Sequence, residues 1–131
     1  MGETSRLIHA YFEAFNRDDL EGQLATLSDD VAHEINEGPV EIGIDAFRAF
    51  KHRMDMNYRE RIVDLVVFEN GERGAAEFTV DGQYVGTDEG LPEATGQSYS
   101  IPAAVFVTVQ SGKIARITSY YNLKAWIAAI V

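Results

Sequence analysis

Three side chains of this sequence combine a reactive group with a position from which it would face an enclosed cavity. His33 lies in a short alternating stretch, residues 31–36, on the same face as Ile35, and imidazole is the most frequent general base because it titrates near neutral pH. Tyr11 lies on the apolar stripe of an expected helix, where its ring packs while its hydroxyl donates a hydrogen bond. Asp88 lies in a long loop, and burial raises the pKa of a carboxylate toward values that suit a base. We predict that these three residues are catalytic.

Each of the three residues also has a purely structural interpretation that the sequence leaves open. A histidine in a core often bonds to a carboxylate or a backbone carbonyl, and a core tyrosine often has a satisfied hydroxyl. Asp88 and Glu89 together form an acidic loop on a surface that is acidic throughout. No metal site is predicted, because His9, His33 and His52 lie on three different expected elements and none has a second ligand at metal spacing. No cofactor is predicted either.

The cavity itself is predicted from a hairpin near the C-terminus. Strands over Tyr99–Val109 and Ile114–Tyr121 flank a turn at residues 110–113, in which Gly112 accepts the positive φ of a tight turn. Strand alternation directs one set of side chains toward the cavity and the other set away from it: Ala115, Ile117, Ser119 and Tyr121 inward, and Ile114, Arg116, Thr118 and Tyr120 outward. The predicted ligand contacts come from this hairpin and the elements that face it: Ile35, Phe50, Tyr84, Tyr99, Ala104, Phe106, Ser119 and Tyr121.

The remaining elements are predicted from periodicity and turn chemistry. A first helix begins with a cap at Thr4 or Ser5, and a short second helix, capped by Asp18, extends to Leu27 and ends at residues 28–30. The other predicted elements follow in order: a strand over 31–36, a helix over Ile44–Met56, strands over Tyr58–Phe68 and Arg73–Val85 joined at Asn70-Gly71, a loop over 86–97, and a C-terminal helix over Leu123–Ile130 capped by Asn122.

This order of elements predicts a single α+β domain over residues 1–131, in which helices cover one side of a curved antiparallel sheet. A curved sheet covered by an amphipathic helix forms a cone, and the wide end of a cone is a natural ligand pocket. The outer face of such a sheet carries valine, isoleucine and threonine and needs a cover. We therefore expect a homodimer that pairs two copies through that face.

The amino-acid composition argues against several classes of binding partner and of chemistry. The chain has 11 basic and 21 acidic residues and a net charge of -10, which argues against binding to nucleic acid or to anionic membranes. It contains no cysteine, so thiol chemistry and disulfides are excluded. The absence of cysteine, of a secretory leader and of a long apolar run predicts a cytoplasmic protein whose partner is a small hydrophobic molecule.

Two parts of the chain resemble a known superfamily. Residues 11–22, YFEAFNRDDLEG, followed by LSDD at 27–30, resemble the opening of nuclear transport factor 2-like proteins, in the branch of ketosteroid isomerase and SnoaL-like polyketide cyclases. Residues 86–92, GTDEGLP, and the segment YYNL at 120–123 resemble a narrower ketosteroid isomerase-related group. The resemblance covers nearly the whole chain and implies the cone-shaped fold.

The same resemblance has a specific consequence for the chemistry. Ketosteroid isomerase uses an aspartate base with an oxyanion hole made of a tyrosine and a protonated aspartate. The tyrosine matches Tyr11, whereas the base falls on Ile35, or on Asn36 if the register shifts by one, and the second aspartate falls on Ala104. The resemblance therefore implies that any proton transfer uses other groups, with His33 in place of the missing base.

Two functions follow from the sequence. In the first, the chain is an enzyme of isomerase, cyclase or dehydratase type that removes and returns a proton of a small carbonyl compound, with His33 as base and Tyr11 as donor to the enolate oxygen. In the second, it is a carrier or sensor of a hydrophobic molecule without catalysis. A third possibility, activation of water, needs a buried carboxylate pair with an arginine, which the cavity faces predicted from the sequence do not supply.

Overall fold

The computed structural model describes residues 2–131 as four helices and one six-stranded sheet. The helices are α1 Glu3–Asn16, α2 Leu20–Leu24, α3 Ile44–Asn57 and α4 Leu123–Ile130. The strands are β1 Leu27–Ile35, β2 Glu41–Ile42, β3 Tyr58–Asn70, β4 Arg73–Tyr84, β5 Gln97–Gln110 and β6 Lys113–Tyr121.

The strands follow the order β2-β1-β6-β5-β4-β3, and every neighbouring pair is antiparallel except β1 and β6, which run parallel. The sheet is therefore mixed, whereas the sequence predicted an antiparallel one. The parallel pair arises because β1 and β6 are distant in the chain and joined through α3 and the long hairpins, not through a tight turn. The α+β class and the curved sheet over N-terminal helices are confirmed.

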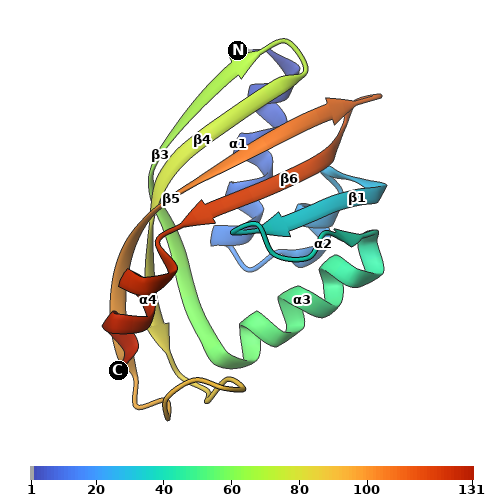
Figure 1. Cartoon of the computed structure of the whole chain (residues 1–131). Helices are drawn as coiled ribbons and strands as arrows, with labels where there is room; N and C mark the ends of the chain where they lie inside the picture. The colour runs from blue at the N-terminus through green and yellow to red at the C-terminus, as the bar shows by residue number, and fades with distance from the viewer. Residues whose placement is uncertain (1) are drawn as a thin grey trace.

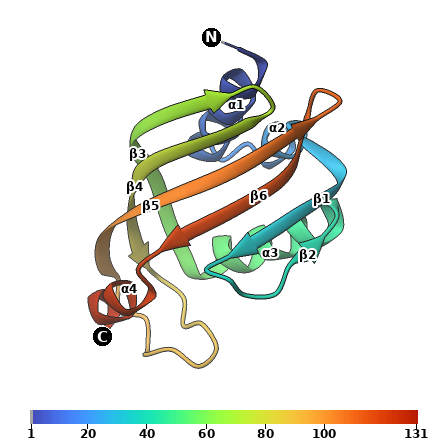
Figure 2. The ribbon, with the colours of Figure 1, turned by 45° about the horizontal axis from the view of Figure 1, so that its top comes forward.

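Figures 1 and 2 show the sheet curving around α1 and α3, which lie on the same concave side. α4 and the loop after β4 lie at one end of the sheet, near the C-terminal end of α3. The side chain of Gln97 joins the loop to α4, because its Nε2 donates to the carbonyl oxygens of Glu93 and Ile130. Leu91 and Ala94 of the loop also pack in one cluster with Trp126 and Ile130 of α4, so the two short elements together close this end of the molecule.

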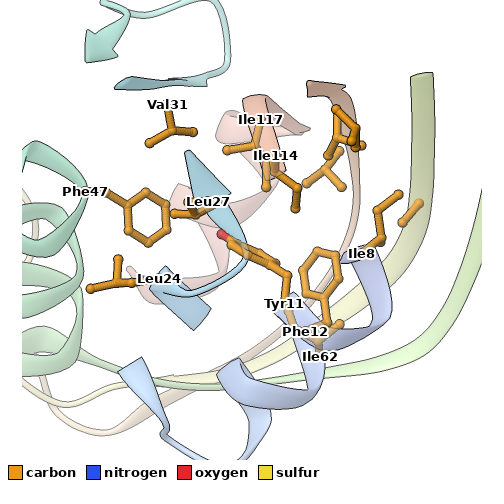
Figure 3. Packing of buried hydrophobic residues seen from close by; sticks show 14 of the residues in the cluster. Ile8, Tyr11, Phe12, Leu24, Leu27, Val31, Phe47, Ile62, Ile114 and Ile117 are labelled. Carbon is orange, nitrogen blue, oxygen red and sulfur yellow. The ribbon is translucent and has the colours of Figure 1, made fainter. Parts of the chain in front are cut away.

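The core lies between the sheet and the first helices. Phe12 of α1 packs on Phe78 of β4 with ring centroids 4.9 Å apart, and Figure 3 shows Leu24, Leu27 and Phe47 gathered around the end of Tyr11. Apolar residues at helical spacing on α1 and at alternate positions on the strands form this core, as the sequence pattern predicts. Within residues 2–131, no helix has the length and apolarity needed to span a membrane.

Several boundaries differ from the prediction. α2 ends at Leu24, so Leu27 begins β1 and is not on a helix. The cap of α2 is Asp19, whose carboxylate accepts from the backbone nitrogen of Gly22, and not Asp18. α1 has Gly2 at its cap position; the Thr4 hydroxyl instead donates to the carbonyl of Gly71, which ties the helix to the hairpin between β3 and β4.

Candidate functional site

A cavity of about 420 Å³ lies between the concave face of the sheet, α1, α3, α4 and the loop after β4. Its walls are mostly apolar, with a few polar groups at defined points, which is typical of a small-molecule site. Of the predicted site residues, all except Tyr84, Ala104 and Phe106 line this cavity: Tyr11, His33, Asp88, Ile35, Phe50, Tyr99, Ser119 and Tyr121.

His33 projects from β1 into the cavity and is only 5% exposed. Its ring meets Phe47 and Phe50 of α3 at centroid distances of 5.0 and 4.7 Å. The imidazole makes no hydrogen bond to any residue of the described chain 2–131. Burial lowers the pKa of His33, and the charge of Glu41 opposes that shift in part, so the ring is neutral at physiological pH and free to accept a proton.

Tyr11 contributes its ring to the cavity wall, and in Figure 3 its hydroxyl is directed toward Leu27. The ring packs edge-on against Phe12 at 5.0 Å and Phe47 at 6.3 Å. Burial raises the pKa of Tyr11, while the neighbouring side chain of Gln23 opposes the shift. The hydroxyl therefore keeps its proton and acts only as a neutral donor.

Asp88 reaches the cavity from the loop after β4 and is held there by two tyrosines. Its Oδ2 accepts from the hydroxyl of Tyr58 at 2.8 Å, and its backbone nitrogen donates to the hydroxyl of Tyr84 at 2.9 Å. The Tyr84 hydroxyl in turn donates to the carbonyl of Pro92 at 2.6 Å. Tyr84 is fully buried and does not line the cavity, so it anchors the loop, whereas the sequence suggested a ligand contact.

Glu60 is a carboxylate of the cavity wall that was not among the residues predicted from the sequence. It follows Tyr58 on β3, and its Oε2 accepts a hydrogen bond of 2.5 Å from the hydroxyl of Tyr99 on β5. Burial raises the pKa of Glu60, against the Tyr99 hydrogen bond and the charge of Lys51, which lower it. Strand alternation could have indicated that Glu60 faces inward, because it lies two residues from each of the buried residues Tyr58 and Ile62 and so shares their face of the strand.

The prediction that Ala104 and Phe106 line the cavity is wrong by one residue in β5. Ala103 and Val105 line it, and Ala104 and Phe106 point to the outer face, where Phe106 is 43% exposed. The position matched to the missing oxyanion-hole aspartate is an alanine in either register, because residues 103 and 104 are both alanine. Asn36, the alternative position for the missing base, accepts from the backbone nitrogen of Tyr121 at 2.9 Å and is a structural residue.

A bulge in β6 changes which of its side chains point toward the core. The pairing of β5 and β6 shifts register between Thr108 and Val109, so that Val109 pairs with Ile114. Ile114 is consequently fully buried, although simple alternation directs it outward with Arg116. Beyond the bulge, Ile117 is buried, and Ser119 and Tyr121 line the cavity as predicted.

Arg53 of α3 also lines the cavity and lies over the ring of Phe50, 5.7 Å from its centroid. Together with Glu60 and Asp88 it would supply the residue types for water activation, but in the described part of the chain it forms no ion pair with either carboxylate. Among residues 2–131, no group of three or more histidine, aspartate or glutamate side chains is placed to hold a metal ion.

A surface cleft of about 750 Å³ lies against the other side of the same wall. It runs along α3 and β3 and includes Lys51 and Asp55, whose side chains pair at 3.2 Å. Glu60 and Tyr58 line both the cleft and the cavity. Phe15, Phe50 and Met54 also line both, so the cleft and the cavity adjoin along α3 and β3.

Comparison with known proteins places these features in a family. Residues 8–117 match the model of the SnoaL-like domain. A structure from Xanthomonas campestris pv. campestris, named a “putative polyketide cyclase”, is 50% identical with a TM-score of 0.96, over 98% of this chain and 97% of that one. A protein of the same name from Pseudomonas putida KT2440 is 50% identical with a TM-score of 0.95, over 100% and 99% of the two chains.

A more distant likeness concerns the fold alone. A protein of unknown function from Burkholderia pseudomallei K96243, described as nuclear transport factor 2-like, is 21% identical with a TM-score of 0.81, over 100% of this chain and 99% of that chain. The fold expected from residues 11–22 and 27–30 is therefore confirmed, and the family match over residues 8–117 confirms the SnoaL-like branch of that expectation. No protein with a curated description matches the chain.

Proposed function

The chain belongs to the SnoaL-like domain family, and on this basis we propose that it binds a small hydrophobic carbonyl compound in the cavity and acts on it as a cyclase or isomerase. The observation that supports the proposal is a buried, neutral imidazole that faces an apolar cavity whose wall also contains the ring of Tyr11, a phenol that keeps its proton. Proton transfer from carbon requires a base that is unprotonated and a donor that is not.

The proposed reaction begins when a ring nitrogen of His33 removes a proton from the carbon next to the ligand carbonyl. The electron pair of that bond moves to the carbonyl oxygen. The Tyr11 side chain, whose hydroxyl lies toward Leu27, would turn into the cavity to donate a hydrogen bond to the resulting enolate. In an isomerase, the imidazolium then returns the proton to a different carbon of the ligand. In a cyclase, the enolate carbon instead forms the ring bond with a second carbonyl carbon of the ligand, whose C=O π electrons move to oxygen, and the imidazolium protonates the resulting alkoxide. Besides His33, the cavity provides two carboxylates, Glu60 and Asp88, as further proton acceptors.

Deuterium exchange tests this proposal without knowledge of the product. The full chain is incubated in deuterated water with a panel of small apolar ketones, and incorporation next to the carbonyl is followed by mass spectrometry. We expect His33→Ala to reduce incorporation by about 100-fold or more. His52→Ala is the matched control, because His52 is exposed on α3 and lines no part of the cavity. An unchanged rate in His33→Ala contradicts the role of His33.

A non-catalytic carrier is the second candidate. It is favoured by the direction of the Tyr11 hydroxyl toward Leu27. It is also favoured by the apolar residues Ile35 and Ala104, onto which the resemblance to ketosteroid isomerase places two catalytic carboxylates. A carrier would retain a ligand through purification, detectable by native mass spectrometry. It would also show stoichiometric binding of that ligand without deuterium incorporation.

We also propose that the chain forms a homodimer through the outer face of the sheet. Phe106 and Tyr120 lie side by side on this face, with ring centroids 5.9 Å apart, and both are about 40% exposed. Val66 and Phe68 of β3 extend the same apolar surface. A second copy would cover the patch.

The proposal includes two further points. The acidic composition argues against a nucleic-acid or membrane partner, and the absence of cysteine supports a cytoplasmic location.

A further inference from the structure

The end of the cavity below α4 differs in character from the end near His33. Four aromatic side chains line it from three strands and a helix: Tyr58 of β3, Tyr99 of β5, Tyr121 of β6 and Trp126 of α4. Two carboxylates, Glu60 and Asp88, line the same end. We refer to these six residues as the aromatic box.

The rings of the box stand at steep angles to one another. Trp126 meets Tyr99 at 85° and Tyr121 at 79°, with centroid distances of 6.0 and 6.4 Å, and meets Tyr58 at 53° and 5.6 Å. Rings in this arrangement form the adjoining walls of a corner, whereas parallel rings would form a closed stack. A cation bound in such a corner lies within about 6 Å of several ring centroids at once.

The two carboxylates are fixed by tyrosine hydroxyls and not by cations. Tyr99 donates to Glu60, and Tyr58 donates to Asp88. Within residues 2–131 the ion pairs are Arg17–Asp19, Arg48–Glu21 and Lys51–Asp55, so neither carboxylate of the box has an ion-pair partner in the chain.

Lys51 and Arg53 lie close to the box without forming an ion pair with its carboxylates: the charge of Lys51 acts on Glu60 from a distance, and Arg53 lines the same cavity. Lys51 pairs with Asp55, has a side chain only 12% exposed, and lies 4.3 Å from the ring centroid of Phe15. Arg53 lies over Phe50 on the α3 wall. A partly buried carboxylate without a cation is costly when ionised, and a cationic ligand group removes that cost.

We infer that the aromatic box binds a cationic nitrogen, in a tertiary amine or a quaternary ammonium group, at one end of an otherwise hydrophobic ligand. The rings attract the cation through their faces, and the two carboxylates balance its charge. The inference rests on the proposed function and narrows its substrate class: the carbonyl end of the ligand lies near His33, and the amine end lies below α4.

Fluorescence of Trp126 provides a direct test, because it is the single tryptophan of the chain. The full chain is titrated with benzyltrimethylammonium and, separately, with neopentylbenzene, which has the same shape with carbon in place of the charged nitrogen. We expect both probes to change the Trp126 emission, and the cation to bind about ten-fold more tightly than its neutral isostere.

Two variants test whether Glu60 and Asp88 cause the preference for the cationic probe over the neutral one. Glu60→Gln keeps an acceptor for Tyr99, and Asp88→Asn keeps one for Tyr58, while each removes a negative charge. Each is expected to reduce the preference for the cation about three-fold or more, with unchanged affinity for the neutral probe. Glu89→Gln is the matched control, because it removes the same charge from the adjacent, exposed loop position that does not line the cavity.

The possible outcomes separate the inference from the function on which it rests. Equal affinity for the two probes overturns the aromatic box as a cation site and leaves the hydrophobic cavity standing. A preference that Glu89→Gln reduces as much as Glu60→Gln and Asp88→Asn do is a general effect of surface charge, and also overturns the inference. If neither probe alters the emission of Trp126, both the cation site and ligand binding in this cavity are rejected.

Discussion

Tyr99 on β5 reaches Glu60 on β3 across the intervening strand, because the residue between them is Gly82. Glu60 pairs with Gly82, and Gly82 pairs with Tyr99, so the three residues form one row across the sheet. A Cβ atom at position 82 would lie 2.3 Å from Cζ of Tyr99 and 2.5 Å from its hydroxyl oxygen. The missing side chain thus provides the space in which the phenol meets the carboxylate.

Replacement of this glycine tests the relationship directly. Gly82→Ala places a methyl group inside the Tyr99 ring, so we expect a loss of about 1–3 kcal/mol in the free energy of unfolding and a shift in the emission of Trp126, which contacts Tyr99. Urea denaturation measures the first effect. The double variant Gly82→Ala/Tyr99→Ala is expected to lose less than the sum of the two single variants; additive losses would show that the ring is not the obstacle.

Glu60 is expected to make stability fall as pH rises. Burial raises its pKa in the folded chain, so its protonated form contributes stability that is complete below the unfolded value of about 4.3 and is lost as pH passes the folded value. Glu60→Gln mimics the protonated form. The variant should match the wild type in acid and exceed its stability at pH 8 in urea denaturation. A wild-type advantage at pH 8 would show that the ionised carboxylate is well accommodated.

His33 should produce a slope of the opposite sign. Burial lowers its pKa in the folded chain, so the unfolded chain takes up the proton first, and stability falls as pH drops below about 6.5 toward the folded value. His33→Gln removes this dependence and should flatten the profile below about pH 6.5. His52→Gln, at an exposed position of α3, controls for the loss of an imidazole that is not buried. A profile unchanged in His33→Gln contradicts the buried neutral ring.

The sequence predicted the elements of this fold well, because the apolar periodicity of α1 and the turn at Asn70-Gly71 report local physics. It was less successful where one residue changes the parity of a strand. The register shift between the pairs Thr108–Arg116 and Val109–Ile114 turns Ile114 inward. No residue type in that segment predicts such a shift. The placement of Phe106 failed for the related reason that β5, with apolar residues on both faces, has no alternation to read.

The residues of the candidate site were likewise predicted where the local pattern was regular and missed where their position depends on distant strands. His33 and Ile35 were placed correctly because polar and apolar residues alternate in β1. Glu60 was overlooked because it lies between two charged residues, Arg59 and Arg61, and because the apolar residues of β3 from Ile62 onward occupy both faces and indicate no inward side. Its partner Tyr99 also lies 39 residues away in the sequence. A long-range pair of this kind depends on strand register and on Gly82, which sequence periodicity does not specify.

Asn16, the last residue of α1, is expected to be important for stability although it is polar. Its Nδ2 donates to the carbonyl of Ile62 at 2.9 Å, and its Oδ1 accepts from the nitrogen of Ile62 at 2.8 Å. Asn16→Ala leaves both backbone groups of β3 without this partner and should cost about 2 kcal/mol in thermal or urea unfolding. Asn16→Asp keeps only the acceptor, so its loss should fall between those of wild type and alanine; a larger loss in aspartate than in alanine would contradict the pairing.

The proposed dimer predicts that a charge on the outer face of the sheet changes the mass of the particle in solution. Phe68 of β3 and Phe106 of β5 share a row across Ala75 of β4, so together with Tyr120 they form a continuous apolar surface. Phe106→Glu inserts a carboxylate that would be buried without a partner in the interface, and should convert a dimer to a monomer in size-exclusion chromatography with light scattering. Met56→Glu, on the exposed surface of α3, is the matched control and should leave the dimer intact. A wild-type chain that is already monomeric at high concentration would reject this interface, and a dimer that persists in Phe106→Glu would place it elsewhere.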